Sequence, residues 1–135
     1  MASVLTLDVS GAFDRVLKEQ LIWALRQQGL PQAIYNWVFF FMSDQWIILA
    51  FDGQESPAFS VVTGIPQGSP LSLILFLFYN MKLLEQCANP HSEIGCLGFV
   101  DDITLIAWGE STENNCWQLA KTHVQCDWWA RRHGT

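Results

Sequence analysis

The spacing of apolar residues near the start of the chain predicts first a strand and then a helix. Residues 3–8 alternate apolar and polar side chains and include β-branched ones, which is typical of a strand, and this strand ends at Asp8. Three leucines recur every four residues within positions 17–28, and a helix is therefore expected there. Gly29 follows as a residue suited to ending that helix.

The next segment predicts a second helix and then a β-hairpin. Pro31 suits the first turn of a helix. The apolar residues of this helix are Ile34, Trp37, Val38 and Phe41. Residues 46–51 and 59–63 are rich in β-branched and aromatic side chains, which predicts two strands. They flank Asp52 and Gly53, so we expect a hairpin with a longer loop.

A loop rich in glycine and proline leads into a strongly apolar helix. Residues 63–70 hold two glycines and two prolines, which fix the backbone, and Gln67 projects an amide from it. Ser69 is suited to the N-cap, and Pro70 to the first turn, of a helix that runs to about Cys87. We therefore expect an ordered loop between the hairpin and this helix.

The last third of the chain predicts a second hairpin and a long helix. Residues 94–100 and 103–108 are strand-like, and Asp101 and Asp102 between them are expected to form a two-residue turn. A helix is expected over residues 112–133, since an acid in its first turn and basic residues in its last match the helix dipole, and a glycine follows. The apolar residues that share one face of it are Trp117, Ala120, Val124 and Trp128.

The order of these elements predicts the fold class. They follow one another as a strand, two helices, a hairpin, a helix, a second hairpin and a helix. This order is typical of an α+β fold, with an antiparallel sheet and helices packed on one face. No repeat or low-complexity segment interrupts the 135 residues, so we expect one domain.

Composition and charge narrow the class of protein. Hydrophobic residues make up 50% of the chain and charged residues 15%, which is typical of a folded protein. The apolar runs 37–42 and 71–79 are too short to span a bilayer, and no membrane role is expected. The net charge of −6 argues against this chain alone binding a nucleic-acid backbone. The four cysteines form no CxxC pair and follow no signal peptide, which favours a reducing, intracellular compartment over a disulfide framework.

The acids at the strand ends are the strongest candidates for chemistry. If Asp8, Asp101 and Asp102 converge at one sheet edge, each pair of carboxylates about 4 Å apart costs about 4 kcal/mol at an effective dielectric of about 20. Such a cluster is tolerable where cations bind it, and Mg²⁺ prefers carboxylates together with waters and substrate phosphates. An Asp-Asp pair is also simply a good turn. The dipeptide taken alone leaves both interpretations open.

Three motifs in order give the chain a specific resemblance. Residues 7–14 read Leu-Asp-Val-Ser-Gly-Ala-Phe-Asp, residues 64–72 read Gly-Ile-Pro-Gln-Gly-Ser-Pro-Leu-Ser, and residues 98–102 read Gly-Phe-Val-Asp-Asp. Over nearly the whole chain, they resemble the catalytic motifs in the palm of reverse transcriptases. Their details look most like non-LTR retrotransposons of the fungal LINE type. The resemblance implies an RNA-directed DNA polymerase that uses two-metal nucleotidyl transfer.

This resemblance implies a role for each matching residue. Asp8 and Asp101 match the metal-binding aspartates and Asp102 the second acid of the same motif, so all three are expected to be catalytic. The backbone carbonyl of Val9 is implied as a further ligand of two Mg²⁺ ions, or of Mn²⁺. Phe13 matches the aromatic residue that packs beneath the incoming sugar and selects deoxynucleotides. The implied nucleotide-binding residues are Val9, Gly11, Ala12, Phe13, Gln67 and Gly68.

The glycine-rich loop also has a physical interpretation of its own. Gly64 and Gly68 would let the backbone approach a nucleotide closely, and Gln67 offers both a donor and an acceptor to the base pair or sugar. In the motif, Asp14 lies on the far side of Phe13 from the metal-binding acids. We expect it to cap a helix or form a salt bridge, with no catalytic role.

The resemblance implies partners as well. An RNA template, a DNA primer and dNTPs would bind the full-length enzyme, in the nucleus. Residues 1–135 correspond to the palm as a partial domain, without the upstream fingers and the downstream thumb, so the isolated chain is expected to be inactive. The alternative is a non-enzymatic retrotransposon remnant or apolar interaction module, which would self-associate through exposed aromatic residues. A palm-type nucleotide cyclase is disfavoured by the loop at 64–70.

Overall fold

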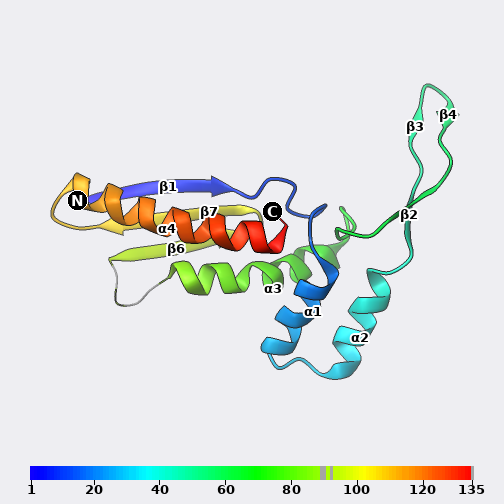
Figure 1. Ribbon diagram of the computed structural model, residues 1–135, viewed down its shortest axis with the longest axis horizontal. Coiled ribbons are helices and arrows are strands. Elements are labelled where there is room, and N and C mark those ends of the chain that lie inside the picture. The colour runs from blue at the N-terminus through cyan, green and yellow to red at the C-terminus, as the bar shows by residue number, and fades with distance from the viewer. Residues whose placement is uncertain (89–90, 92, 135) are drawn as a thin grey trace.

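The computed structural model describes residues 1–88, 91 and 93–134. Its elements in chain order are β1 (Ala2–Asp8), α1 (Lys18–Gln27), α2 (Gln32–Phe41), β2 (Gln45–Ile47), β3 (Ala50–Phe51), β4 (Gln54–Glu55), β5 (Phe59–Val61), α3 (Pro70–Cys87), β6 (Ile94–Phe99), β7 (Asp102–Trp108) and α4 (Thr112–His133). Figure 1 shows an elongated molecule, with a sheet and two long helices at one end and a projecting hairpin at the other.

Three antiparallel strands in the order β1-β7-β6 form the main sheet. Alternate residues of these strands point to opposite faces, and only one face is covered, by α3 and α4. The covered face contributes to the core the side chains of Leu5, Leu7, Ile94, Ile103, Leu105 and Ala107. The opposite face leaves Val4, Leu97 and Phe99 exposed. The predicted α+β class, with helices on one face of an antiparallel sheet, is confirmed.

Helix α3 crosses the centre of the molecule and carries much of its core. It contacts α1, α4 and β6, and it buries Phe76, Tyr79 and Leu83. The predicted start at Pro70 and end at Cys87 are confirmed, although the Ser69 side chain at the N-cap makes no capping hydrogen bond. Over the part of the chain that the structure describes, no helix is long and apolar enough to cross a membrane.

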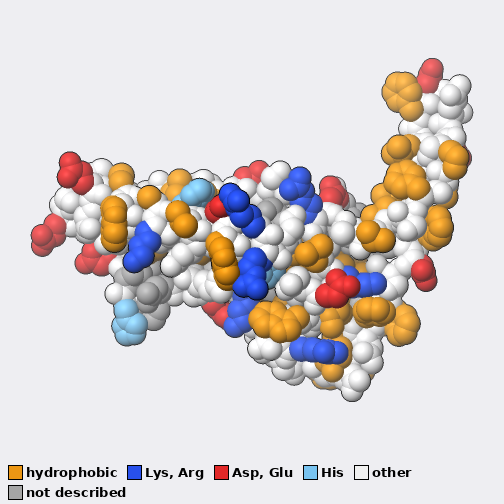
Figure 2. Space-filling view, in the orientation of Figure 1, with side chains coloured by type: hydrophobic (Ala, Val, Ile, Leu, Met, Phe, Trp, Pro, Cys, Tyr) orange, Lys and Arg blue, Asp and Glu red, His pale blue; other side chains and the backbone are white. Residues whose placement is uncertain are grey.

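The first predicted hairpin is more broken than expected. Residues 46–51 do not form one strand: β2 pairs with β5, and a separate two-residue ladder joins β3 to β4 around the Asp52-Gly53 turn. These four strands form the projecting arm of Figure 1. They make no sheet with β1, β6 or β7. Figure 2 shows apolar side chains along the arm, and those that are exposed are Trp46, Ile47, Ile48, Leu49, Phe51, Phe59 and Val62.

The limits of α4 agree with the prediction, but its buried face does not. The Ser111 side chain accepts a hydrogen bond from the Asn114 amide (3.2 Å), and Gly134 ends the helix at a φ of +77°. The four residues predicted to share an apolar face are all exposed. The face that packs against the sheet and α3 instead carries Asn115, Leu119, Thr122, Cys126 and Trp129. Helix α2 departs similarly, because of its four predicted apolar residues only Val38 is fully buried.

Candidate active site

The open face of the sheet brings two acids side by side at one end. Asp8 is the last residue of β1 and lies directly opposite Asp102, the first residue of β7. Asp102 in turn lies opposite Phe99 of β6. Because cross-strand partners point to the same face, the two carboxylates are neighbours, which is unfavourable for like charges. The sheet therefore holds a repulsive pair that a cation would relieve.

Asp101 lies in the turn beside this pair, as predicted, but the turn begins one residue earlier than the sequence indicates. The two-residue turn is formed by Val100 and Asp101, whereas Asp102 already belongs to β7, so the predicted Asp101–Asp102 turn is wrong by one position. The Asp101 carbonyl accepts a hydrogen bond from the Val9 amide (3.0 Å), which fixes Asp101 beside the end of β1.

A buried asparagine, which the sequence did not single out, supports this turn from behind. Val100 has a φ of +55°, a strained conformation for a β-branched residue. Asn80 of α3 is 2% exposed and donates from Nδ2 to the Val100 carbonyl oxygen at 3.4 Å. An amide side chain directly after the apolar run at 73–79 was the available signal. Asn80 thus joins the core helix to the turn that carries Asp101.

The donor set at this end of the sheet fits a hard divalent cation. The described residues form two ion pairs, Lys82–Glu85 and Arg131–Asp127, and neither includes Asp8, Asp101 or Asp102. Carboxylate oxygens without a cationic partner are suitable ligands for such an ion. Among the described residues, however, no three acidic, histidine or cysteine side chains are gathered closely enough to hold a metal by themselves. The predicted convergence of three carboxylates is therefore corrected to one facing pair with a neighbour in the turn.

The glycine-rich loop is attached to the segment that follows β1. The Gly64 amide donates to the Val16 carbonyl (2.9 Å), and the Ile65 amide donates to the Phe13 carbonyl (2.8 Å). Gly64 has a φ of +93°, and a Cβ there would lie 2.9 Å from the Asp14 carbonyl oxygen. The close approach predicted for Gly64 is therefore to the backbone of Asp14, and Gly64 is itself buried.

A cavity of about 380 Å³ opens beside this loop. Its lining residues are Phe13, Gln67, Gly68, Ser69, Pro70 and Leu73. The Phe13 ring packs against Phe76 of α3, with centroids 5.2 Å apart. Asp14 accepts a hydrogen bond from Gln67 Nε2 at 2.9 Å, so its role is to hold the Gln67 amide, in place of the predicted cap or salt bridge. Three of the residues predicted to bind a nucleotide therefore line one cavity.

The remaining predicted binding residues lie between β1 and this cavity in the chain. Val9 is half-buried, and Gly11 is exposed with a φ of +64°. Ala12 is 5% exposed, and its methyl group belongs to the hydrophobic core. A contact between Ala12 and a nucleotide would therefore involve the backbone. The roles of these three residues in binding remain predictions.

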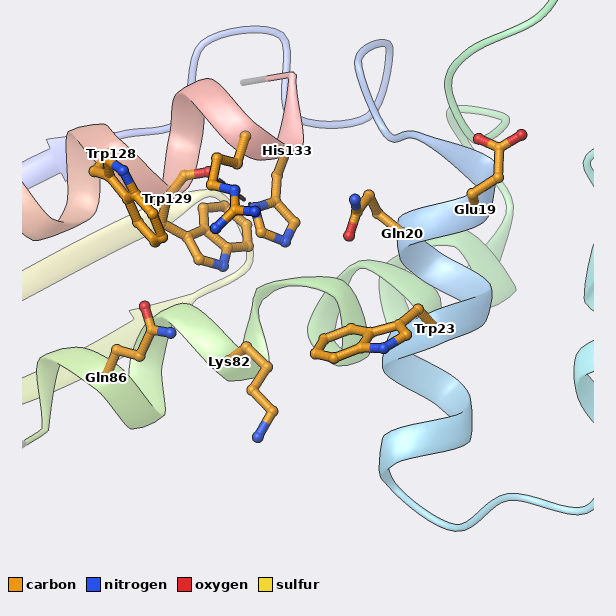
Figure 3. Close-up of a pocket in the computed structure, with 9 residues that line it drawn as sticks. Glu19, Gln20, Trp23, Lys82, Gln86, Trp128, Trp129 and His133 are labelled. Carbon is orange, nitrogen blue, oxygen red and sulfur yellow. Dashed lines mark hydrogen bonds between the residues drawn. The ribbon is translucent and has the colours of Figure 1, made fainter.

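A larger cavity, of about 540 Å³, lies between α1, α3 and α4 and contains none of the predicted site residues (Figure 3). In it the Trp129 indole stacks on the His133 ring, with centroids 4.0 Å apart. The Tyr79 hydroxyl donates to the His133 carbonyl (2.5 Å) and accepts from the Leu17 amide (3.4 Å). Burial raises the pKa of the Tyr79 hydroxyl and lowers the pKa of the His133 imidazole.

Stability is expected to fall as the pH is lowered from about 7.5 to about 5.5, partly through His133. Because its folded-state pKa lies below the ordinary value of about 6.5, the unfolded chain binds the proton more readily. The contribution of His133 is present above that value and is lost as the pH falls through the folded pKa. Urea unfolding of His133→Gln should show a weaker pH dependence of the free energy of unfolding than wild type. Equal pH dependence in wild type and His133→Gln would contradict this assignment.

The geometry defines a class of protein. An antiparallel sheet that is backed by helices on one face and carries acids at the end of its open face is consistent with the palm of a nucleotide polymerase. A sequence profile of the reverse transcriptase (RNA-dependent DNA polymerase) family matches residues 2–134, and the chain belongs to this family. Reverse transcriptases use divalent metal ions, in agreement with the donor set described above.

The relatives are retrotransposon polyproteins. The retrovirus-related Pol polyprotein from the type-1 retrotransposable element R2 of Popillia japonica is 25% identical over 112 residues, covering 77% of this chain and 18% of the relative. The polyprotein from the type-2 element R2DM of Drosophila melanogaster is 33% identical over 113 residues, covering 77% of this chain and 10% of the relative. The predicted non-LTR class is confirmed, while a fungal origin stays a prediction.

A solved structure supports the fold. Apo telomerase from Candida tropicalis, truncated from its C-terminal domain, matches with a TM-score of 0.66 and 17% identity, covering 90% of this chain and 26% of that one. This likeness concerns the fold alone. The chain spans 10 to 18% of the length of the curated relatives described above, so the activity and partners of a complete enzyme are a matter for proposal.

Proposed function

We propose that this chain is the palm of an RNA-directed DNA polymerase that extends a DNA primer with dNTPs on an RNA template. The observation that carries the proposal is the Asp8–Asp102 pair on the open face, with Asp101 in the adjoining turn. A divalent cation would relieve the repulsion within this pair. On the covered face, α3 and α4 pack against the strands and hold in place the backbone that carries these acids.

We further propose that Mg²⁺ occupies this end of the sheet as two ions, held by Asp8, Asp101, Asp102 and the Val9 carbonyl. When bound, such ions supply charge neutralisation for the triphosphate and lower the pKa of the attacking primer hydroxyl. The two carboxylates of the facing pair leave coordination positions for water and substrate phosphates, an arrangement that Mg²⁺ favours. The Asn80 hydrogen bond keeps the Asp101 turn in place while substrates enter and leave.

The cavity beside the glycine-rich loop is the proposed site for the sugar of the incoming nucleotide. The Phe13 ring forms one wall of the cavity and packs against Phe76, which holds the ring in place. A ring fixed in this position would exclude the 2′-hydroxyl of a ribonucleotide. Gln67 is oriented by Asp14 and presents its amide oxygen as an acceptor. Gly68 leaves the approach open, because a Cβ there would meet nothing within 4 Å.

Replacing Phe13 with valine is expected to raise ribonucleotide incorporation relative to deoxyribonucleotide incorporation by roughly 10-fold or more, because the smaller side chain makes room for the 2′-hydroxyl. The ratio of kcat/KM for the two nucleotides measures this effect. The control is Leu73→Ala, which changes the same cavity without altering the aromatic wall. An unchanged ratio in Phe13→Val would rule out Phe13 as the sugar-contacting residue.

Primer extension on an RNA template tests the proposed activity. We expect incorporation from a protein that carries these residues within a complete polymerase domain, in the presence of Mg²⁺. The 135-residue chain alone should be inactive, since its net charge of −6 provides little attraction for a nucleic-acid backbone. Absence of incorporation from the complete domain would reject the polymerase proposal. A nuclear location is proposed from the family resemblance.

A second candidate, an apolar interaction module without catalysis, is favoured by the exposed side chains of the arm. Phe51 at its tip is 87% exposed, and Trp46 is 64% exposed. Calorimetric titration of the chain with Mg²⁺ and a dNTP distinguishes the two candidates. Binding that is lost in Asp8→Asn and Asp101→Asn supports the polymerase, and no dependence on these acids supports the module.

A further inference from the structure

Three of the four cysteines meet where α3, β6 and α4 pack together. Cys87 is the last residue of α3, Cys96 lies in β6 on the covered face of the sheet, and Cys126 lies in α4. The Cys87 and Cys126 sulfurs are 3.1 Å apart, and both residues are buried. Cys96 lies near enough to Cys87 to raise the pKa of its thiol. The fourth, Cys116, is exposed on α4 and lies outside this cluster.

We propose that Cys87 and Cys126 are a modification site at which a peroxide converts the two thiols to a disulfide. An S–S bond is about 2.05 Å long, so the two sulfurs need to approach by only about 1 Å. Both belong to long helices that contact each other and pack on the same face of the sheet. All four cysteines are free in the structure.

The cavity beside Cys126 favours it as the sulfur that reacts first. Hydrogen bonding within the cluster raises the pKa of Cys87, and hydrogen bonding to Cys87 lowers the pKa of both Cys126 and Cys96. Thiolate character favours oxidation. Cys126 also lines a cavity of about 210 Å³ together with Trp129, Asp8 and Val9, at the end of the sheet that carries the candidate active site, and this cavity admits a molecule as small as hydrogen peroxide.

The reaction balances with peroxide as the sole oxidant. The Cys126 sulfur attacks one peroxide oxygen, the O–O bond breaks, and the first water leaves as Cys126 becomes a sulfenic acid. The Cys87 sulfur then displaces the sulfenic oxygen, which leaves as the second water with the Cys87 thiol hydrogen. Two electrons pass from the sulfurs to peroxide, and one S–S bond forms.

The disulfide would enclose the hairpin that carries the acids. Cys87 and Cys126 are separated by 39 positions in the sequence, and that interval contains β6, Asp101, Asp102 and β7. A covalent link across this interval restricts the unfolded chain. The oxidised chain should therefore unfold at a temperature roughly 10 °C higher than the reduced chain.

Mass spectrometry of the peroxide-treated 135-residue chain tests the proposal. After treatment, free thiols are blocked under denaturing conditions, and the chain is cut with trypsin and a glutamate-specific protease without reductant. These enzymes place the four cysteines on separate peptides, which are residues 86–93, 94–110, 114–121 and 122–131. We expect a linked species of peptides 86–93 and 122–131 that has lost two hydrogen atoms and separates on reduction.

Three variants identify the bond. Cys116→Ser is the matched control on the same helix and should keep both the link and the rise in unfolding temperature, and Cys96→Ser should keep the link. Cys126→Ser should lose both. Because a substitution at a buried position can impair folding, the linked peptides of the oxidised wild-type chain test the proposal independently of the variants. Three other main products would overturn the proposal: a Cys87–Cys96 disulfide, two chains joined through Cys116, or sulfinic Cys126 without a link. An unchanged unfolding temperature after oxidation would also overturn it.

Discussion

Replacing Asp101 with asparagine is expected to lower primer extension roughly 10³-fold in a protein that carries these residues within a complete polymerase domain. The substitution removes one negative charge from the end of the sheet at which we propose that metal ions bind. It keeps the size of the side chain and the backbone hydrogen bond from Val9 to residue 101. The loss should therefore appear in kcat/KM, with little change in the free energy of unfolding.

The control for Asp101→Asn is Asp52→Asn. Asp52 is exposed in the turn between β3 and β4 at the tip of the projecting arm, away from the main sheet. Its replacement should leave primer extension unchanged. Asp8→Asn provides a second readout, because removal of the like charge opposite Asp102 should raise the stability of the metal-free chain by about 0.2–1 kcal/mol. Primer extension by Asp101→Asn at the wild-type rate would reject a metal-binding role for Asp101.

Replacing Gly64 with alanine is expected to destabilise the chain by about 3 kcal/mol. An L-residue at a φ of +93° is strained, and the added Cβ would lie 2.9 Å from the Asp14 carbonyl oxygen and 3.1 Å from its Cα. Those neighbours are backbone atoms that cannot rotate away. Relief of the clash would separate the loop from Val16 and Phe13, to whose carbonyl groups residues 64 and 65 donate hydrogen bonds.

Urea denaturation of Gly64→Ala measures this loss, and Gly68→Ala is the matched control. Gly68 has a similar φ of +86°, but a Cβ there meets nothing within 4 Å. Its replacement should cost only the strain of the conformation, about 1 kcal/mol. The difference between the two variants isolates the contact with Asp14. Equal losses would mean that the loop does not depend on this close approach.

The parts of the fold that were predicted correctly are those with strong local signals. Pro70 and Gly134 mark helix ends through their own backbone preferences, so the limits of α3 and α4 could be predicted without knowledge of the rest of the molecule. The strand alternation before Asp8 likewise gave β1 and the position of its acid. The strand that ends at Asp8 and the helix that begins at Pro70 both border the candidate site, so these two parts of the site could be predicted from local features.

The buried face of α4 could not be predicted in this way, because the helix carries two apolar stripes. Trp117 and Trp128 define one of them, and Leu119, Cys126 and Trp129 define the other. Only contacts with α3 and the sheet decide between these stripes. The turn at Asp101 was misplaced for a similar reason, since its position depends on the Asn80 hydrogen bond across 20 positions in the sequence.

Helices cover the sheet on one side only, and this has a consequence for how the protein can change. Substitutions on the covered face of the sheet alter the packing against the helices and, with it, the anchoring of Asp8 and Asp102. Side chains on the open face are in contact with solvent, so substitutions there have little effect on the free energy of unfolding. Evolution can thus vary the side chains that surround the acids on the open face while the packing of the covered face stays the same.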